Sequence, residues 1–147
     1  MFGRSRWLIA AALLLSGCGG ESRSQAQAQA RCAVDHGELP TWATTGFSDP
    51  HPRIPHVVGD SGRITAILFG DLVAPPAKDR SNKILWVSKD PQQAMSDLKI
   101  RAQRGDEVVE RVVSGGPGPS IVDLPSGCWQ LTLTWSGRTD HLNLQYH

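Results

Sequence analysis

Hydrophobic and polar residues alternate most regularly near the end of the sequence. Over residues 129–135, large apolar side chains occupy every second position, and polar side chains occupy the positions between them. A period of two predicts a strand that is buried on one face. The same alternation returns over 142–146, after a turn signal at Ser136 and Gly137. We therefore expect a hairpin here with one apolar face.

Five further segments have the composition of short strands. Two of them are nearly continuous apolar runs, which are typical of strands buried on both faces of a sheet. The five segments span residues 64–69, 84–87, 98–102, 108–113 and 120–124. Between them, Asp90 and Pro91 are the residue types that favour the N-cap and the first position of a helix. One helical turn is therefore expected over 90–96.

About seven short strands separated by turns that contain glycine or proline predict an all-β fold. The pattern is typical of a single antiparallel β-sandwich of immunoglobulin-like size. The Cys…Trp…Cys spacing of antibody domains is absent, so the prediction concerns the architecture and not that topology. A small β-barrel is the main alternative. Trp86, Trp129 and Trp135 fall at alternating or apolar-run positions and are expected in the core.

Residues 33–62 have a different composition from the strands. Four prolines fall within sixteen residues here, amid aromatic side chains and three histidines. Such a segment is expected to run extended over the sandwich, held down by its aromatic residues. Trp42 and Phe47 are expected to cap one end of the sandwich, with contact to a ligand as the alternative. The candidate ligand-facing residues of the segment are Trp42, Phe47, His51 and His56.

The first residues of the sequence have the pattern of a signal peptide. Arg4 and Arg6 precede an uncharged apolar run over 7–15, and two small residues follow it. The run is too short to span a membrane, which needs about 20 apolar residues. We therefore predict a signal peptide over 1–17.

Residues 15–18, Leu-Ser-Gly-Cys, resemble the lipobox of bacterial lipoproteins. The resemblance implies cleavage before Cys18 and a diacylglycerol on its sulfur, and two acyl chains anchor a protein stably to a membrane. We expect the chain to be held in this way on the extracytoplasmic face of the cell membrane. The alternative is an ordinary secretory signal with a cysteine nearby by chance. Residues 18–31 contain almost no large apolar side chain and predict a flexible tether, followed by the domain over 32–147.

Cysteine counting adds a second expectation. If Cys18 carries lipid, Cys32 and Cys128 remain as a pair in an oxidising compartment, where a disulfide is favoured over two free buried thiols. By strict alternation Cys128 points away from the face of Trp129. A bend at 126–127 is one way of bringing the two sulfur atoms together.

Charge limits the classes of partner. The sequence has 15 Lys and Arg against 14 Asp and Glu, and removal of the two arginines in 1–17 leaves 13 against 14. No basic stripe points to nucleic acid, and no polybasic patch points to anionic lipid headgroups. The expected partners are the membrane, through the N-terminal lipid, and a protein or glycan of the cell envelope.

The sequence offers few candidate metal-binding or catalytic residues. His36, His51 and His56 would form a metal site only if Asp35 or Asp49 joined them, and no closed ligand spacing occurs. We therefore expect surface histidines, no metal and no cofactor. The sequence also lacks a Gly-x-Ser-x-Gly nucleophile motif. The expected function is a non-catalytic binding or scaffold module, and the alternative is an extracytoplasmic enzyme, with or without a metal, that uses residues 35–56.

Three blocks carry a resemblance to a known group. Residues 119–129, which include Gly-Cys-Trp and lead into the final hairpin, resemble the C-terminal block of small uncharacterised bacterial lipoproteins. Residues 82–86 and 39–43 are similar to blocks in actinobacterial members of that group. The likeness covers most of 32–147 and implies an immunoglobulin-like envelope domain. It carries over no catalytic residue.

Overall fold

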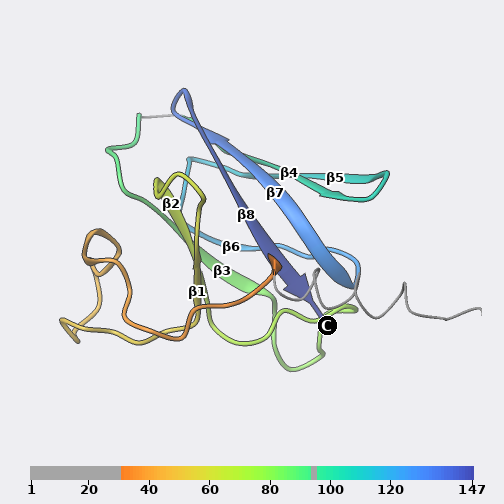
Figure 1. Cartoon of the computed structure of the whole chain (residues 1–147), viewed down its shortest axis with the longest axis horizontal. Helices are drawn as coiled ribbons and strands as arrows, with labels where there is room; N and C mark the ends of the chain where they lie inside the picture. Colours follow the sequence, from red (N-terminus) through yellow and green to blue (C-terminus); the bar gives the residue numbers. More distant parts are fainter. Residues whose placement is uncertain (1–30, 94–95) are drawn as a thin grey trace, which may run out of the picture.

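The computed structural model describes residues 31–93 and 96–147, which form eight strands in two four-stranded antiparallel sheets (Figure 1). The first sheet holds β1 (His56–Val58), β2 (Ile64–Leu68), β3 (Lys83–Ser88) and β6 (Pro119–Ile121), in that order. The second sheet holds β5 (Glu107–Val113), β4 (Leu98–Arg104), β7 (Gly127–Trp135) and β8 (Arg138–Tyr146), in that order. The predicted all-β sandwich is confirmed. The predicted signal peptide and Cys18 lie outside the described residues.

The strand order differs from that of antibody domains. In an antibody constant domain, the third strand along the chain crosses to the opposite sheet. Here β3 stays in the first sheet and pairs antiparallel with β2, from Ile64 opposite Ser88 to Leu68 opposite Ile84. The chain crosses to the second sheet only afterwards, at β4. The protein is therefore a β-sandwich whose strands are connected in a different order from those of an antibody domain.

The core lies between the two sheets, and its largest side chains are tryptophans. Trp86, Trp129 and Trp135 are each at most 1% exposed, as the alternating pattern predicts. Each indole N–H donates a hydrogen bond, and Trp135 does so to the hydroxyl of Ser88 at 2.9 Å. Because β7 carries Trp135 and β3 carries Ser88, this bond joins the two sheets. Buried indoles keep a polar partner in this way without exposing the ring.

Two-residue turns close both hairpins of the second sheet. Gly105, with a φ of 56°, begins the turn between β4 and β5, which is the arrangement of a type II′ turn. Ser136 and Gly137 have φ values of 45° and 69°, as a type I′ turn requires. The turn predicted at these two positions is confirmed.

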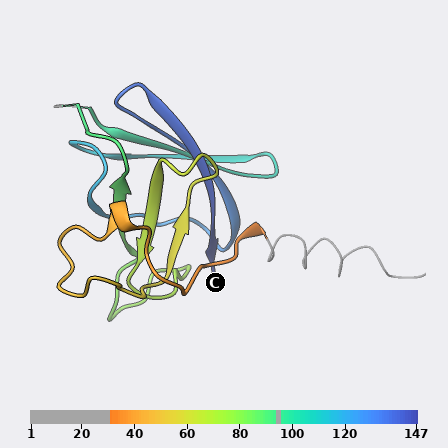
Figure 2. The same ribbon diagram turned by 60° about the vertical axis from the view of Figure 1, so that its left-hand side comes forward.

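The proline-rich segment lies against the outer face of the first sheet (Figure 2). Thr65 and Ile67 alternate with the core-facing residues of β2, yet both are fully buried. The segment contributes Leu39 and Ala43 as buried residues, and the amide of Leu39 donates to the carbonyl of Pro52 at 3.0 Å. It also contains the 3-10 turn η1 (Thr41–Ala43) and β1, and the sequence pattern predicts neither.

The helical turn predicted after Asp90 is not formed over 91–93, and the rest of that prediction includes residues 94–95, which are outside the described chain. The Asp90 carboxylate does not cap a helix. It lies 3.4 Å from the guanidinium of Arg63 and 3.3 Å from that of Arg138. The Asp90 carboxylate is therefore engaged in these two ion pairs and does not serve as a helix N-cap.

Candidate functional site

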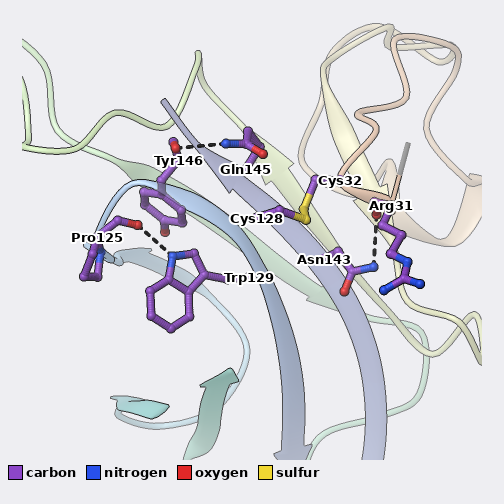
Figure 3. The surroundings of a disulfide bond; sticks show 8 residues. All are labelled: Arg31, Cys32, Pro125, Cys128, Trp129, Asn143, Gln145 and Tyr146. Carbon is purple, nitrogen blue, oxygen red and sulfur yellow. Dashed lines mark hydrogen bonds between the residues drawn. A yellow bond between two sulfur atoms is a disulfide. The ribbon is translucent and has the colours of Figure 1, made fainter. Parts of the chain in front are cut away.

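Cys32 and Cys128 form a disulfide, as predicted, with their Cα atoms 5.9 Å apart (Figure 3). Cys128 is half-buried on the outer face of β7, whereas Trp129 is fully buried on the inner face. The predicted alternation is therefore confirmed, and the chain brings Cys32 to the outer face. The side-chain amide of Asn143, on β8, donates to the carbonyl of Arg31 at 3.0 Å and holds the entering chain there.

This disulfide bears on the location of the protein. It joins residues 96 positions apart and ties the start of the domain to its C-terminal hairpin. Disulfides of this kind are typical of secreted and periplasmic proteins and are rare in the cytosol, where thiols are kept reduced. The bridge therefore points to an extracytoplasmic location. Over residues 31–93 and 96–147, no helix is long and apolar enough to cross a membrane.

A cavity of about 350 Å³ lies beside the disulfide. Its volume is at the lower end of the range of small-ligand sites. Its apolar wall combines side chains from the entering chain, from the turn before β1, from β2 and from the segment after β2. Four of these side chains are Val34, Pro55, Leu68 and Leu72. Polar groups of His36, Asp71, Gln145 and His147 complete the lining.

Backbone pairing fixes two walls of this cavity. Asp35 and His56 exchange two backbone hydrogen bonds of 2.9 Å, which position Val34 and His36 on either side of Asp35. On the opposite side, the amide of His147 donates to the carbonyl of Leu72 at 2.9 Å. Side chains line the cavity, and paired backbone holds the segments that carry several of them.

None of the four candidate ligand-facing residues lines this cavity. Trp42 and Phe47 are half-buried in the proline-rich segment. The side chain of His51 is 74% exposed and lies 3.3 Å from a Glu38 carboxylate oxygen. His56, in contrast, is buried. Its Nδ1 lies 2.8 Å from the carbonyl oxygen of Ile54, so Nδ1 carries the hydrogen and donates it.

The other histidine and carboxylate candidates also separate. Nε2 of His56 lies 3.9 Å from a carboxylate oxygen of Asp35, which is the closest approach between a histidine ring and a carboxylate in this set. Asp49 accepts a hydrogen bond from the backbone amide of His51 at 2.8 Å and thereby closes its own turn. Of these histidine and carboxylate candidates, His36 is the one that lines the cavity. Within the described chain, no group of three or more His, Cys, Asp or Glu side chains is close enough to hold a metal ion.

Three buried polar side chains make hydrogen bonds that the sequence pattern does not predict, although the alternation over 142–146 does place Tyr146 on the inner face. Asn82 is 2% exposed, and its amide bonds both the N–H and the C=O of Val73 and also a carboxylate oxygen of Asp123. Tyr146 donates its hydroxyl hydrogen to the carbonyl of Val122 at 2.6 Å. These bonds hold the connection between β2 and β3 and the connection between β6 and β7. The third, Asp140, holds the turn before β2.

Burial raises the pKa of Tyr146 well above its usual value, the nearby carboxylate of Asp123 raises it further, and the guanidinium of Arg111 lowers it by less. The phenol therefore stays protonated over the whole physiological range and keeps its donor role. It is a structural group, since its hydroxyl points into the protein and is bonded to a backbone carbonyl.

Comparison with known protein families, with curated proteins and with solved structures found no match. The resemblance to small bacterial lipoproteins therefore stays a prediction. What stands without it is a small all-β domain of two sheets with a disulfide.

Proposed function

We propose that the chain is a membrane-anchored extracytoplasmic lipoprotein whose sandwich is a non-catalytic binding or scaffold module of the cell envelope. The observation that carries the proposal is the disulfide between Cys32 and Cys128. A disulfide of this kind is typical of an oxidising compartment, and the signal-peptide pattern of 1–17 supplies a route to one. Cys18, in the lipobox-like motif that ends this pattern, then supplies the anchor.

The cavity beside Cys32 is the proposed binding site. It lies where the chain enters the domain, so a tether over 18–31, reaching roughly 20 Å as a random coil, would hold the cavity close to the membrane. Its apolar wall and few polar groups fit an apolar side chain or a sugar ring of an envelope protein or glycan. Asp71 and His147 supply hydrogen-bonding groups at the lining.

The anchor is tested by metabolic labelling with a fatty-acid probe in a bacterial host. The chain should take up the label, and Cys18→Ala should abolish labelling and release the protein from the membrane fraction. The matched control replaces both Cys32 and Cys128 with serine, which removes the other two cysteines and should leave labelling intact. Labelling of the Cys18→Ala variant would show that Cys18 is not the lipidated residue.

The binding site is tested by photo-crosslinking in cells. A photoreactive amino acid at position 71 lies at the cavity, whereas the same amino acid at position 139 lies on the outer face of β8. We expect a discrete crosslinked envelope species from position 71 and none from position 139. The same species from both positions would argue for the scaffold surface of the second sheet, and crosslinks from 139 alone would overturn the cavity as the site.

The alternative, an enzyme that uses residues 35–56, draws only on the contact between Asp35 and His56. His56 is buried and does not line the cavity, so a substrate in the cavity would not reach its ring. Calorimetry with zinc and with copper tests the metal-assisted form. Binding heat at micromolar metal that is lost in His36→Ala would favour this alternative, because His36 is the histidine of residues 35–56 that lines the cavity.

A further inference from the structure

Strand β5 is the long free edge of the sandwich. In the part of the chain that the structure describes, β5 pairs only with β4, and the hairpin of these two strands projects beyond the first sheet (Figure 1). The edge of β1 is bridged by Asp35, and the edge of β8 is covered at His141 by the amide of Asp60 and at its end by Leu72. The remaining edge, β6, has only three residues and begins with Pro119, which has no amide hydrogen to donate.

The turn fixes which backbone groups of β5 face outward. A two-residue turn is closed by a hydrogen-bonded pair, here Arg104 and Glu107, and such pairs alternate along an antiparallel ladder. The backbone groups of Val108, Glu110 and Val112 therefore point away from β4. Val108 and Val112 are 42% and 59% exposed, so apolar side chains accompany this row of unpaired amides and carbonyls. An edge of this kind is a template for another strand.

We propose that a second copy of this chain pairs antiparallel along β5, about a two-fold axis at Val109. An axis at position 109, 110 or 111 pairs at least five residues of β5 with the second copy, and an axis nearer either end of the strand pairs three or fewer. An axis at Glu110 sets that carboxylate against itself, and an axis at Arg111 sets two guanidinium groups together. An axis at Val109 instead places Glu107 opposite Arg111 of the second copy, and it does so twice by symmetry.

The charges of β5 therefore select one register of the three. In that register, Val108 of each copy exchanges backbone hydrogen bonds with Glu110 of the other, and the two second sheets become one continuous sheet with the same face outward. One edge contact covers less surface than a permanent interface, so the dimer is expected to be weak and to depend on concentration. The dimer does not depend on the proposed anchor or on the cavity.

Cysteine crosslinking of the full chain, in detergent under mild oxidation, tests the register. Residues opposite one another in a non-hydrogen-bonded pair have Cα atoms about 4.5 Å apart, which is within the range for a disulfide. Val109→Cys should therefore give a disulfide-linked dimer, whereas Glu110→Cys and Arg111→Cys should not. A crosslink from Glu110→Cys alone would show the wrong register, and the unsubstituted chain controls for any link through Cys18.

Charge reversal tests the ion pairs. Glu107→Arg or Arg111→Glu alone should weaken dimerisation, measured by analytical ultracentrifugation, by about tenfold, because two ion pairs become two repulsions. The double variant Glu107→Arg/Arg111→Glu should restore it. Glu38→Arg, on the proline-rich segment, makes the same change of net charge away from β5 and should have no effect. A monomer at all concentrations, or a double variant no better than the single ones, would overturn the proposal.

Discussion

Asp140 packs its buried carboxylate against Gly59, in the space that a side chain at position 59 would occupy. A Cβ atom built on Gly59 would lie less than 3.0 Å from all three atoms of the carboxylate group. The carboxylate accepts the backbone amides of Ser61 and Arg63 at 2.8 and 2.9 Å. Asp140 lies on β8 in the second sheet, and it accepts two backbone amides of the turn between β1 and β2 in the first sheet. The carboxylate therefore joins the two sheets at this end of the sandwich.

This arrangement predicts coupled effects at the two positions. Asp140→Ala should lower the free energy of unfolding by about 3 kcal/mol, because two backbone amides of the turn lose a charged acceptor. Gly59→Ala should cost about 2 kcal/mol by overpacking against the carboxylate. In the double variant the added methyl group meets no carboxylate, so the two losses should not add. Urea denaturation of the four proteins measures the coupling, and strictly additive losses would contradict the contact.

The disulfide predicts a second effect on stability. Replacement of Cys32 and Cys128 by serine removes a crosslink between residues 96 positions apart, which should cost about 4 to 5 kcal/mol in the chain-entropy description. It should also release the entering chain from β7, so that limited proteolysis cuts first near Arg31. Equal stability of the oxidised and reduced wild-type protein would contradict this account. Ser126→Ala, close to the bridge, serves as a control and should change stability by less than about 1 kcal/mol.

How much of this fold can be read from the sequence depends on the length and regularity of each strand. The alternating apolar residues of β7 and β8 predict both strands, their turn and their inner face, because one face is buried and the other is not. β1 has only three residues and follows Pro55, so it has no period to detect. It forms because Asp35 and β2 supply backbone partners on its two sides.

The candidate site is less predictable for a related reason. Its lining combines residues near the start of the domain, such as Val34, with residues around Leu72 and at the chain end, such as His147. Only the tertiary fold brings these segments together, and none carries a local motif. The disulfide could be predicted because chain export and cysteine number limit the choice of partners. The burial of His56 could not, because a proline-rich segment has no alternation that assigns its side chains to a face.

From the hydrogen bonds of Asn82 we predict that a substitution of nearly the same shape lowers the stability of the domain. Asn82→Asp keeps the size of the side chain but removes the amide hydrogens that bond the carbonyl of Val73 and the carboxylate of Asp123. It also places a second negative charge beside Asp123. We expect a loss of about 3 kcal/mol at neutral pH.

The Asn82→Asp loss should shrink as the pH falls below about 5, because a protonated carboxyl group regains one donor. Thermal unfolding at several pH values, with Asn82→Ala as the comparison, separates the two causes. Asn82→Ala has no carboxyl group at position 82, so its deficit relative to wild type should change little over the same range. A pH-independent deficit in Asn82→Asp would show that lost packing, and not charge, is responsible.

The buried hydroxyl of Tyr146 should limit the stability of the domain at high pH. Tyr146 is the only tyrosine in the sequence, so a phenolate signal can be assigned to it. Burial raises the pKa of the folded-state phenol above the unfolded value of about 10, so the unfolded chain loses this proton first as the pH rises. The contribution of the protonated phenol to the free energy of unfolding is fully present below about pH 10. Above that pH it falls by about 1.4 kcal/mol per pH unit. Tyr146→Phe should cost about 1 kcal/mol at neutral pH, through the lost bond to Val122, and should lack this additional alkaline slope. Near-ultraviolet absorbance of the wild-type protein should show phenolate only as the domain unfolds, and a phenolate signal from the folded protein near pH of about 10 would contradict the burial of this hydroxyl.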